Sequence, residues 1–497
     1  MLTTNPFAFG PVHLRDEDDD DKPKEECGVV GIFNDPDAAS HTVLGLHALQ
    51  HRGQEAAGIV SCDGESFHSH RGLGHVSENF KSEEVMNRLA GPMAIGHNRY
   101  STSGDKALRN VQPFYADLAF GGLALCHNGN LTNAVTLRRQ LVGKGCIFSS
   151  TSDTEVIMQL VARSDFLNVE DRIVDALRKV EGAYSLVALT ATTMYGVRDP
   201  HGIRPLVLGY LEGAHILASE TCALDIIGAE YVRDVEPGEL VVIDHEGVRS
   251  VKPFVPTQRR FCIFEYIYFA RPDSSVEGTS VYHARKRIGE ELARESNVPA
   301  DVIVPVPDSG VPAALGYSVE SGIPFEFGII RNHYVGRTFI QPTQRTRDLG
   351  VKRKHNANRA FLEGKRVVLV DDSIVRGTTS TKIVQMVRQA GATEVHMRIS
   401  SPPTTWPCFF GIDTPEREGL LAAQHSIAEM EKLLGVDSLA FISLDGLYRA
   451  VGEAERGSDR ERTYCDACFT GDYFLPLADR NDTDTTQPKE LSRLRGA

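Results

Sequence analysis

A chain of 497 residues has room for two or three domains, each with a core of its own. A hydrophobic content of 41% and a charged content of 24% are those of an ordinary globular protein, and no run approaches the roughly 18 apolar residues that a membrane helix needs. A net charge of −14 argues against nucleic acid as the main partner, because a phosphate backbone is bound by a basic surface. We therefore expect neither a membrane nor a nucleic acid partner.

The nine cysteines are an odd number spread over the whole chain, which is not typical of a secreted disulfide framework. The first residues also lack the basic and then apolar pattern of a secretory signal. We expect a cytoplasmic protein, in which some of the thiols serve another purpose.

Residues 1–26 are polar and carry eight acidic residues against three basic ones, so we expect a disordered or removable propeptide. A strand-like apolar run, residues 27–33, follows at once and opens on Cys27. If the bond between Glu26 and Cys27 is cut, Cys27 carries both a thiol and an α-amino group with a pKa of about 8. Such a residue holds a nucleophile and its base together.

Four short motifs follow Cys27, and each of them alone is no more than a turn or a strand end. They are GLHALQHRGQE at 45–55, GHNRYST at 96–102, HNGN at 127–130 and SDTE at 152–155. As an ordered set after a candidate N-terminal cysteine they resemble the class II glutamine amidotransferase domain. The resemblance covers about residues 27–255 and implies an N-terminal-nucleophile hydrolase fold, an αββα sandwich of two sheets between helical layers.

The same resemblance implies roles for individual residues. The Cys27 thiolate attacks the side-chain amide of glutamine and forms a thioester. Asn128 and the Gly129 N–H stabilise the oxyanion, Arg99 binds the substrate carboxylate through its guanidinium fork, and Asp153 pairs with the substrate ammonium group.

Strand patterns continue at 184–189, 206–209 and 240–243, and then break at Pro253 and Pro256. We place a domain boundary there, which gives a first domain at 27–255 and a second at 260–475. The residues from 476 to 497 are polar and of mixed charge, and we expect a frayed tail.

The second domain alternates strands with helices, which is typical of a doubly wound parallel sheet. We expect strands at 301–307, 367–370, 394–399 and 439–443, and helices at 282–295 and 381–388. The run at 367–370 is apolar throughout, as in a strand buried on both faces. Ligands of such sheets bind beyond the carboxyl ends of the strands, where residues 308–310 and the pair Asp371 and Asp372 lie.

A turn of small and hydroxylated residues follows this acid pair and leads into a helix, which suits a phosphate group. The acids suit sugar hydroxyls or a divalent cation. Acid pairs of this kind also occur in other nucleotide-binding sheets and as helix caps. The order of strand, acid pair and Gly-Thr-Thr resembles the 5-phosphoribosyl-1-pyrophosphate (PRPP) motif of the type I phosphoribosyltransferases. The resemblance implies that Asp371 and Asp372 hold the ribose hydroxyls and, with Ser309 from the neighbouring turn, help to place Mg²⁺. It also implies that the 5′-phosphate is bound by the residues of the turn, Arg376, Gly377, Thr378, Thr379 and Ser380.

Residues 331–359 form a long polar stretch that carries eight basic residues. Such a stretch is a lid over pyrophosphate or a solvated loop. It is similar to the flexible loop of the glutamine PRPP amidotransferase family, and this resemblance favours the lid and places Lys354 on the substrate.

Cys465 and Cys468 form a C-x-x-C pair, and Cys262 and Cys408 lie far from it in the sequence. Spacing alone leaves two interpretations open: a metal site for zinc or an iron–sulfur cluster, and a set of buried or redox thiols. The family resemblance implies a [4Fe–4S] cluster on these four cysteines. The remaining ones, Cys62, Cys126, Cys146 and Cys222, we interpret as packing residues.

Together the two halves resemble the glutamine PRPP amidotransferase family. The resemblance implies conversion of glutamine, PRPP and water into 5-phosphoribosylamine, glutamate and pyrophosphate, the first committed step of purine synthesis. It also implies an enclosed ammonia passage near Tyr268, feedback by purine nucleotides, and a homo-oligomer, either tetramer or dimer. Two alternatives remain: a hexosamine-forming relative, which would need sugar isomerase domains, and a PRPP-binding regulatory protein without catalysis.

Overall fold

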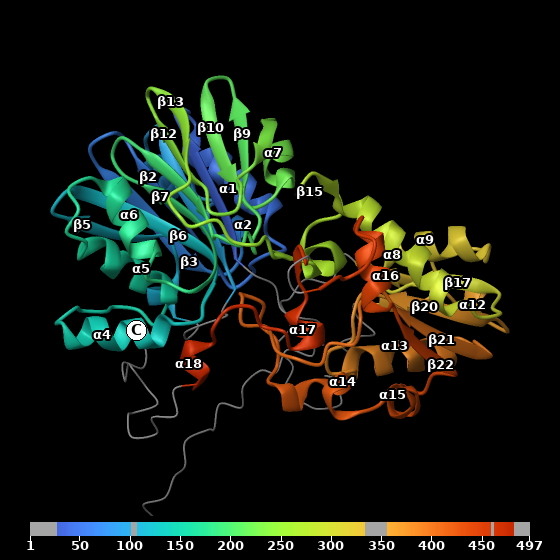
Figure 1. Ribbon diagram of the computed structural model, residues 1–497. Coiled ribbons are helices and arrows are strands. Elements are labelled where there is room, and N and C mark those ends of the chain that lie inside the picture. The colour runs from blue at the N-terminus through green and yellow to red at the C-terminus, as the bar shows by residue number, and fades with distance from the viewer. Residues whose placement is uncertain (1–26, 101–106, 333–354, 459–461, 482–497) are drawn as a thin grey trace, which may run out of the picture.

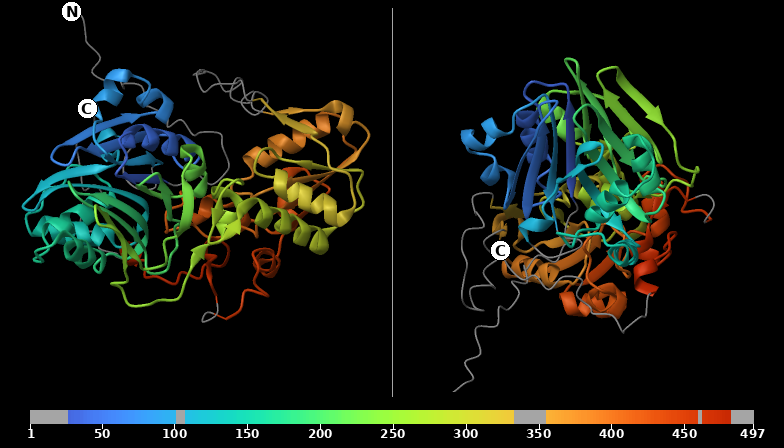
Figure 2. Two further views of the ribbon diagram at one scale, coloured as in Figure 1. Left: turned by 90° about the horizontal axis from the view of Figure 1, so that it is seen from above. Right: turned by 90° about the vertical axis from the view of Figure 1, so that its left-hand side faces the viewer.

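The computed structural model describes residues 27–100, 107–332, 355–458 and 462–481. They form two lobes that lie side by side, as Figure 1 and the view from above in Figure 2 show. Within these ranges no helix has the length and apolar character needed to cross a membrane.

The first lobe contains two antiparallel sheets. The seven-stranded sheet has the order β11 (Glu230–Asp234), β9 (Val207–Leu211), β10 (Ala214–Ala218), β1 (Gly28–Phe33), β4 (Met93–Arg99), β2 (Ala56–Cys62) and β3 (Phe67–Leu73). The six-stranded sheet has the order β13 (Gly247–Val251), β12 (Leu240–Asp244), β8 (Met194–Arg198), β7 (Gly182–Leu189), β6 (Gly121–Leu131) and β5 (Phe114–Leu118).

Both faces of each sheet are covered, and β1 shows how. Its Val29 and Phe33 enter the core between the two sheets, whereas Val30 and Ile32 point to the outer helices, because successive side chains of a strand face opposite ways. The outer layer of the first sheet includes α1 (Ala38–Ala48), α2 (Val76–Asn79), α3 (Glu83–Arg88) and α7 (Thr221–Ile227). That of the second sheet is made of α4 (Ala134–Gly143), α5 (Asp153–Ala162) and α6 (Val169–Leu177). The expected αββα sandwich is confirmed.

The second lobe is a four-stranded parallel sheet in the order β17 (Val302–Pro305), β20 (Arg366–Asp371), β21 (Glu394–Ile399) and β22 (Ser438–Phe441). Its first face packs on α8 (Val281–Ser296), α9 (Val311–Ser321) and α16 (Leu444–Ala450), and its second on α13 (Thr378–Gln389) and α15 (Ile427–Leu434). This is the expected doubly wound sheet. β20 extends one residue beyond the expected 370, so Asp371 ends the strand.

Shorter elements complete the two lobes. They are η1 (Leu108–Asn110), which belongs to the first lobe, and β15 (Ser275–Val276), β16 (Thr279–Ser280), α12 (Arg359–Leu362), η3 (Arg417–Gly419) and α14 (Leu421–Gln424). β18 (Ile329–Arg331) and β19 (His355–Ala357) pair in an antiparallel ribbon. The ribbon joins the two ends of the expected basic lid, and residues 333–354 lie outside the described part of the chain.

The lobes are joined by a connector built from distant parts of the sequence. β14 (Phe261–Cys262) pairs in parallel with β23 (Tyr464–Cys465), and η2 (Glu265–Phe269), a π-helical turn, follows β14. α17 (Ala467–Thr470) and α18 (Ala478–Asn481) follow β23. One hydrophobic core includes Ala183 and Ile203 of the first lobe together with Phe261 and Phe410, so the lobes share apolar packing.

The expectation of a frayed tail from residue 476 is wrong for its first part. α18 packs against the N-terminus of α4, where the Asp479 carboxylate accepts hydrogen bonds from the N–H groups of Val135 and Thr136, at 2.7 and 2.9 Å. A carboxylate at this end of a helix satisfies unpaired donors and opposes the helix dipole. The partner lies more than 340 residues away in the chain, so the local sequence gives no sign of it.

Candidate functional site

Cys27 lies immediately before β1, in the interior of the first lobe, and is 7% exposed. Its Sγ donates a hydrogen bond to the carbonyl oxygen of Tyr100 at 3.6 Å. Burial raises the pKa of the thiol from its ordinary 9.0 to about 11, although the Tyr100 hydrogen bond and the Arg99 guanidinium act in the opposite direction. The thiol is therefore protonated at neutral pH and needs a base before it can act as a nucleophile.

Arg99 comes to this position through strand pairing. It ends β4, which pairs with β1 in a register that sets Gly28 opposite Asn98. The Arg99 side chain is 3% exposed. The structure thus brings the expected carboxylate-binding residue beside the expected nucleophile. The continuation of this motif, Ser101 and Thr102, lies outside the described residues.

The expected oxyanion donors lie on β6. Asn128 is fully buried, and within the described part of the chain neither atom of its side-chain amide has a hydrogen-bond partner. Because an unpaired buried amide is costly, its retention here calls for an explanation, and a bound substrate supplies one. Gly129 has a φ of 141°, and a Cβ there would lie 2.0 Å from the Ala183 oxygen. Only glycine fits this position.

The edge of β6 explains where the Gly129 N–H points. Residues 114–118 of β5 pair only with residues 121–125 of β6, so the later part of β6 has β7 alone as a strand neighbour. On the open edge the His127 N–H donates to the Gln112 side chain at 2.7 Å, and the Leu131 N–H donates to Asp153 at 3.1 Å. By the two-residue period of a strand, the Gly129 N–H points to this same edge.

Asp153 is the first residue of α5 and is buried. Its carboxylate also accepts a hydrogen bond from the Thr154 N–H at 2.9 Å, and the His127 ring lies 3.8 Å away. Burial would raise the pKa of Asp153, but His127 and these N–H donors outweigh it and hold the pKa below its ordinary value. The Asp153 charge also acts on the Cys27 thiol, which it makes harder to ionise. A fixed negative charge therefore faces the nucleophile.

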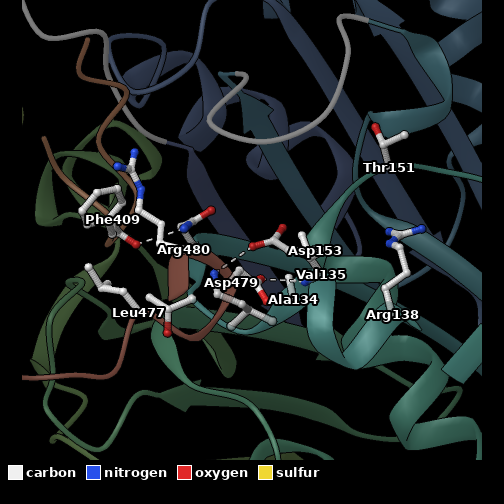
Figure 3. Close-up of a pocket in the computed structure, with 12 residues that line it drawn as sticks. Ala134, Val135, Arg138, Thr151, Asp153, Phe409, Leu477, Asp479 and Arg480 are labelled. Carbon is white, nitrogen blue, oxygen red and sulfur yellow. Dashed lines mark hydrogen bonds between the residues drawn. The ribbon is translucent and has the colours of Figure 1, made fainter. Parts of the chain in front are cut away.

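A cavity of about 240 Å³ adjoins this site (Figure 3). Asp153 and Thr151 line one side of it, Asn130 comes from β6, and Phe409 and Asp479 come from the second half of the chain. Cys27 and Arg99 are not among its lining residues. The cavity is therefore a neighbour of the Cys27 site, with walls from both halves of the molecule.

A second constellation lies at the carboxyl ends of β17 and β20. Asp371 and Asp372 are 1% and 0% exposed. The Ser309 hydroxyl, from the turn after β17, donates to Asp372 Oδ1 at 3.0 Å, and the Ser373 hydroxyl donates to Asp372 Oδ2 at 3.2 Å. A Cβ on Gly310 would lie 2.4 Å from the Val370 oxygen, so this turn packs closely on β20. Parallel pairing thus brings Ser309 to the acid pair.

The small-residue turn leads into α13, as its sequence predicts. Gly377, with a φ of 81°, is the residue before the helix. Arg376 and Thr378 are exposed, Thr379 is half-buried, and Ser380 is buried. The turn thus offers solvent-facing groups at a helix N-terminus, an arrangement that suits an anion.

Sequence reasoning missed Arg285, which faces the acid pair from α8. Its buried guanidinium donates to the carbonyl oxygens of Tyr266, Tyr268 and Ala270, at 2.7–3.0 Å. Burial lowers the pKa of Arg285, whereas the Asp372 charge acts to raise it. Arg285 thereby links η2 to the second site. Arg285 lies on a helix with an ordinary amphipathic pattern, so the sequence does not indicate that its side chain is buried near the acid pair.

Sequence reasoning also missed a buried ion network between the lobes. Glu265 of η2 has no exposed surface and binds Arg52 at 2.6 Å and Arg204 at 3.1 Å, both from the first lobe. Arg52 Nε also contacts Glu220. Burial alone would raise the pKa of Glu220, but Arg52 and His51 hold it well below the ordinary value. The signal that could have found Glu265 is an acid within the aromatic run FEYIYF.

The four cysteines of interest come together from three segments. Cys262 is the strand partner of Cys465, and the N–H groups of Thr405 and Trp406, just before Cys408, donate to the Cys468 carbonyl at 3.1 and 3.0 Å. All four are free thiols. Burial raises the pKa of Cys468 well above its ordinary value, and the other three thiols add to this rise. The described ranges contain no group of three or more His, Cys, Asp or Glu side chains able to hold a metal ion.

The structure therefore forms three separate constellations from the expected residues. The first contains Cys27, Arg99, Asn128, Gly129 and Asp153, the second contains Ser309, Asp371, Asp372 and residues 376–380, and the third contains Cys262, Cys408, Cys465 and Cys468. Lys354 lies outside the described residues.

Comparison with known proteins gives matches for both halves. A glutamine amidotransferase domain model matches residues 97–225, and a phosphoribosyl transferase domain model matches residues 279–400. An amidophosphoribosyltransferase of Rhizobium etli is 59% identical over 469 residues, which are 93% of this chain and 94% of that protein. The amidophosphoribosyltransferase of Bacillus subtilis is 49% identical, over 94% of this chain and 97% of its own.

Comparison with solved structures gives the same family as the sequence matches. The glutamine PRPP amidotransferase of Bacillus subtilis, complexed with ADP and GMP, superimposes with a TM-score of 0.86 at 49% identity, covering 91% of this chain and 98% of that one. Relatives matched over nearly their full length are named as enzymes, and the second half of this chain is a phosphoribosyltransferase domain, which leaves no support for the non-catalytic or hexosamine-forming alternatives. The chain therefore belongs to the amidophosphoribosyltransferase family, the purine-biosynthetic enzymes that combine a glutamine amidotransferase with a phosphoribosyltransferase.

Proposed function

We propose that this amidophosphoribosyltransferase releases ammonia from glutamine at Cys27 and transfers it to C1 of PRPP at the turn that follows β20. The observation that carries the first assignment is Asn128, whose side-chain amide is fully buried and unpaired within the described residues. It lies next to a glycine whose N–H points to the open edge of the same strand. Two donors fixed in this way suit an oxyanion.

In the glutaminase half-reaction the Cys27 thiolate attacks the amide carbon of glutamine, and the carbonyl oxygen becomes an oxyanion held by Asn128 Nδ2 and the Gly129 N–H. The carbon–nitrogen bond then breaks, ammonia leaves with the proton taken from the thiol, and a thioester remains. Water hydrolyses this thioester to glutamate. Arg99 binds the α-carboxylate of the substrate and the ionised Asp153 binds its α-ammonium group.

The base in this scheme is the α-amino group of Cys27, freed by removal of residues 1–26. The raised thiol pKa supports this step, because the buried thiol ionises poorly without a nearby base. An amine with a pKa of about 8 on the same residue is matched to that task.

In the second half-reaction the chain holds the sugar and the phosphate. Asp371 and Asp372 accept hydrogen bonds from the ribose hydroxyls, and Arg376, Gly377, Thr378, Thr379 and Ser380 bind the 5′-phosphate through N–H, hydroxyl and guanidinium donors. Lys354 binds the pyrophosphate. Ammonia forms the new bond to C1 as the bond to pyrophosphate breaks, and the new amine then releases one proton to solvent.

The residues present fit Mg²⁺ at this site. Ser309, Asp371 and Asp372 supply oxygen donors, with the Ser309 hydroxyl 3.0 Å from Asp372. Mg²⁺ in proteins keeps several waters and takes further oxygens from substrate phosphates, so a complete set of protein ligands is not needed. When bound, it would neutralise charge on the leaving pyrophosphate.

The residues present also fit a [4Fe–4S] cluster on Cys262, Cys408, Cys465 and Cys468. Four free, buried or half-buried thiols that influence one another electrostatically are the donor set for such a group. When bound, it would tie the connector to the loop that carries Cys408.

Other parts of the proposal concern partners and location. An enclosed ammonia passage lies near Tyr268, supported by the buried Phe264 and Phe269 of the connector. Purine nucleotides inhibit the enzyme, supported by the Bacillus subtilis relative complexed with ADP and GMP. The enzyme is a cytoplasmic homo-oligomer, dimer or tetramer. Nine free thiols support a reducing compartment.

We further divide the chain into a propeptide at 1–26, a glutaminase domain at 27–255, a phosphoribosyltransferase domain at 260–475 and a tail at 476–497. The gap between β13, which ends at Val251, and β14, which begins at Phe261, supports the central division.

The assignment of Asn128 is tested by the variant Asn128→Ala, assayed with glutamine and with ammonium salts as nitrogen donors. Loss of one oxyanion donor lowers kcat by about 10²–10³-fold. We expect that loss with glutamine and wild-type rates with ammonia. Asn297→Ala, an exposed asparagine after α8, is the matched control. Wild-type glutamine turnover by Asn128→Ala would remove the residue from the mechanism.

A further inference from the structure

The loop that carries Cys408 rests on β6 at the expected oxyanion donors. We define the Cys408 loop as residues 408–412. The Asn130 side-chain amide donates to the Phe409 carbonyl oxygen at 2.9 Å, across 279 positions of sequence, and both residues line the cavity of Figure 3, in which Phe409 is labelled. Asn130 follows Gly129 directly, so the loop contacts the strand one residue from the donors.

A second contact is made by backbone alone. A Cβ on Gly411 would lie 3.1 Å from Gly129 Cα and 3.2 Å from its carbonyl carbon, and Gly411 has a φ of 114°. This approach is tighter than a side chain normally tolerates, and the backbone conformation is one that other residues rarely adopt. Glycine at 411 therefore permits the loop to touch the residue that carries the oxyanion-binding N–H.

A third contact fixes the loop itself. The Arg204 Nε donates to the Phe410 carbonyl oxygen at 3.0 Å, while its Nη1 binds the buried Glu265 at 3.1 Å. Arg204 has no exposed surface. Three consecutive residues of the loop, 409 to 411, are thus each held against the first lobe.

These contacts occur where β6 lacks a second strand neighbour. Pairing with β5 ends at Leu125, so residues 126–131 have a strand neighbour, β7, on one edge only. An oxyanion site works when its donors are fixed before the charge develops. On the open edge Gln112 and Asp153 hold the N–H groups of His127 and Leu131, and the Cys408 loop adds contacts at Gly129 and Asn130 themselves.

We infer that Asn130 and Gly411 are positioning residues for glutamine hydrolysis, which hold the Asn128 and Gly129 donors in place by fixing β6 to the Cys408 loop. The inference rests on the proposed oxyanion role of those two donors. It also means that the glutaminase site is completed by a segment from the second half of the chain. Neither residue touches the reacting atoms in this account.

The test measures kcat and KM for glutamine, and the ammonia-dependent rate, in Asn130→Ala. A misplacement of donors by a fraction of an ångström lowers turnover by about tenfold. We expect this loss in kcat for glutamine, a KM for glutamine within about twofold of wild type, and an unchanged ammonia-dependent rate. A merely structural defect would lower both rates together.

Gly411→Ala provides a second variant, with the same expected pattern. Its matched control is Gly247→Ala at the first residue of β13, where φ is 124° but nothing lies within 4 Å of the added Cβ. The control carries similar backbone strain without the contact to β6, and we expect wild-type kinetics from it.

Two results would overturn the inference: wild-type glutamine kcat in both Asn130→Ala and Gly411→Ala, or equal losses of the glutamine-dependent and ammonia-dependent rates in both. The variant Asn128→Ala distinguishes failure of the positioning inference from failure of the proposed oxyanion role. If Asn128→Ala is inactive with glutamine while the two positioning variants are normal, only the present inference fails. If Asn128→Ala itself is normal, the oxyanion assignment fails.

Discussion

In the first lobe Cys27, Arg99 and Asn128 are almost enclosed, with exposed fractions of 7, 3 and 0%, whereas in the second lobe Arg376 and Thr378 face solvent. The two sites also differ in the secondary-structure elements that carry their residues. The proposed glutaminase residues lie on strands and a helix start inside a sandwich. The proposed phosphoribosyl residues lie at the carboxyl ends of parallel strands, where Asp371 and Asp372 are buried, and at the start of α13, where Thr378 is exposed. A thioester reaction depends on donors fixed in advance away from water, and a large, multiply charged sugar phosphate needs accessible N–H groups at a helix N-terminus.

Removal of the proposed nucleophile should separate the two sites most clearly. Cys27→Ala should lower glutamine-dependent turnover by at least about 10⁴-fold, the scale of nucleophile deletions in enzymes. The ammonia-dependent rate should remain within about twofold of wild type, because the second site is left complete. Steady-state assays with the two nitrogen donors measure both. Equal losses would show that the two sites are not independent.

The Glu265 network is buried between the first lobe and η2. Glu265→Gln leaves two buried arginines, Arg52 and Arg204, without a full counter-charge, which costs about 3–5 kcal/mol of unfolding free energy. Urea denaturation monitored by fluorescence gives the difference. Glu170→Gln, which breaks a partly exposed pair with Arg249, is the control and should change stability by about 0.5 kcal/mol or less. Similar small effects from both variants would contradict the assigned role.

Burial of Cys27 also predicts how the reactivity of its thiol depends on pH in the chain that still carries residues 1–26. Because the raised pKa favours the protonated thiol, the thiolate fraction at any pH below the midpoint is smaller than that of an ordinary cysteine. The alkylation rate of Cys27 should rise with pH toward a midpoint at about 11 instead of the ordinary 9.0. Mass spectrometry of the labelled peptide follows it, with the half-buried Cys146 as an internal control for the reagent. A midpoint near 9 would mean that burial does not govern this thiol.

A conservative substitution in the second site should affect the rates with both nitrogen donors, unlike the substitution of Cys27. Asp372→Asn keeps the shape of a buried side chain but removes the charge that Ser309 and Arg285 face. Loss of hydrogen bonds to a charged group lowers turnover by about 30-fold. Here both the glutamine-dependent and the ammonia-dependent rates should fall together, with Asp165→Asn, an exposed residue, as control. A loss confined to one donor would contradict the assignment.

Structural elements formed by contiguous residues could be predicted from the sequence. β20, the acid pair and the turn before α13 are contiguous, so a run of apolar residues followed by acids and small residues is enough to predict them. The same holds for β1, since the unbroken apolar run from Val29 to Phe33 suits a strand covered on both faces. The sheet classes follow from these patterns.

What the sequence could not provide depends on contacts between distant positions. Asn130 meets Phe409 across 279 positions, Arg52 meets Glu265 across 213, and Asp479 meets α4 across 344. No periodicity or composition near any of these residues signals its partner. The approach of Cys408 to the other three thiols is of the same kind, which is why spacing alone left zinc and redox thiols open.

The most direct test of the central claim is to react the enzyme with a diazoketone analogue of glutamine and to map the adduct by mass spectrometry. The account predicts one adduct per chain, on a peptide that begins with Cys27, together with loss of glutamine-dependent but not ammonia-dependent turnover. Glutamine turnover by a chain in which Glu26 is still joined to Cys27, or inactivation by an adduct on another residue, would contradict it.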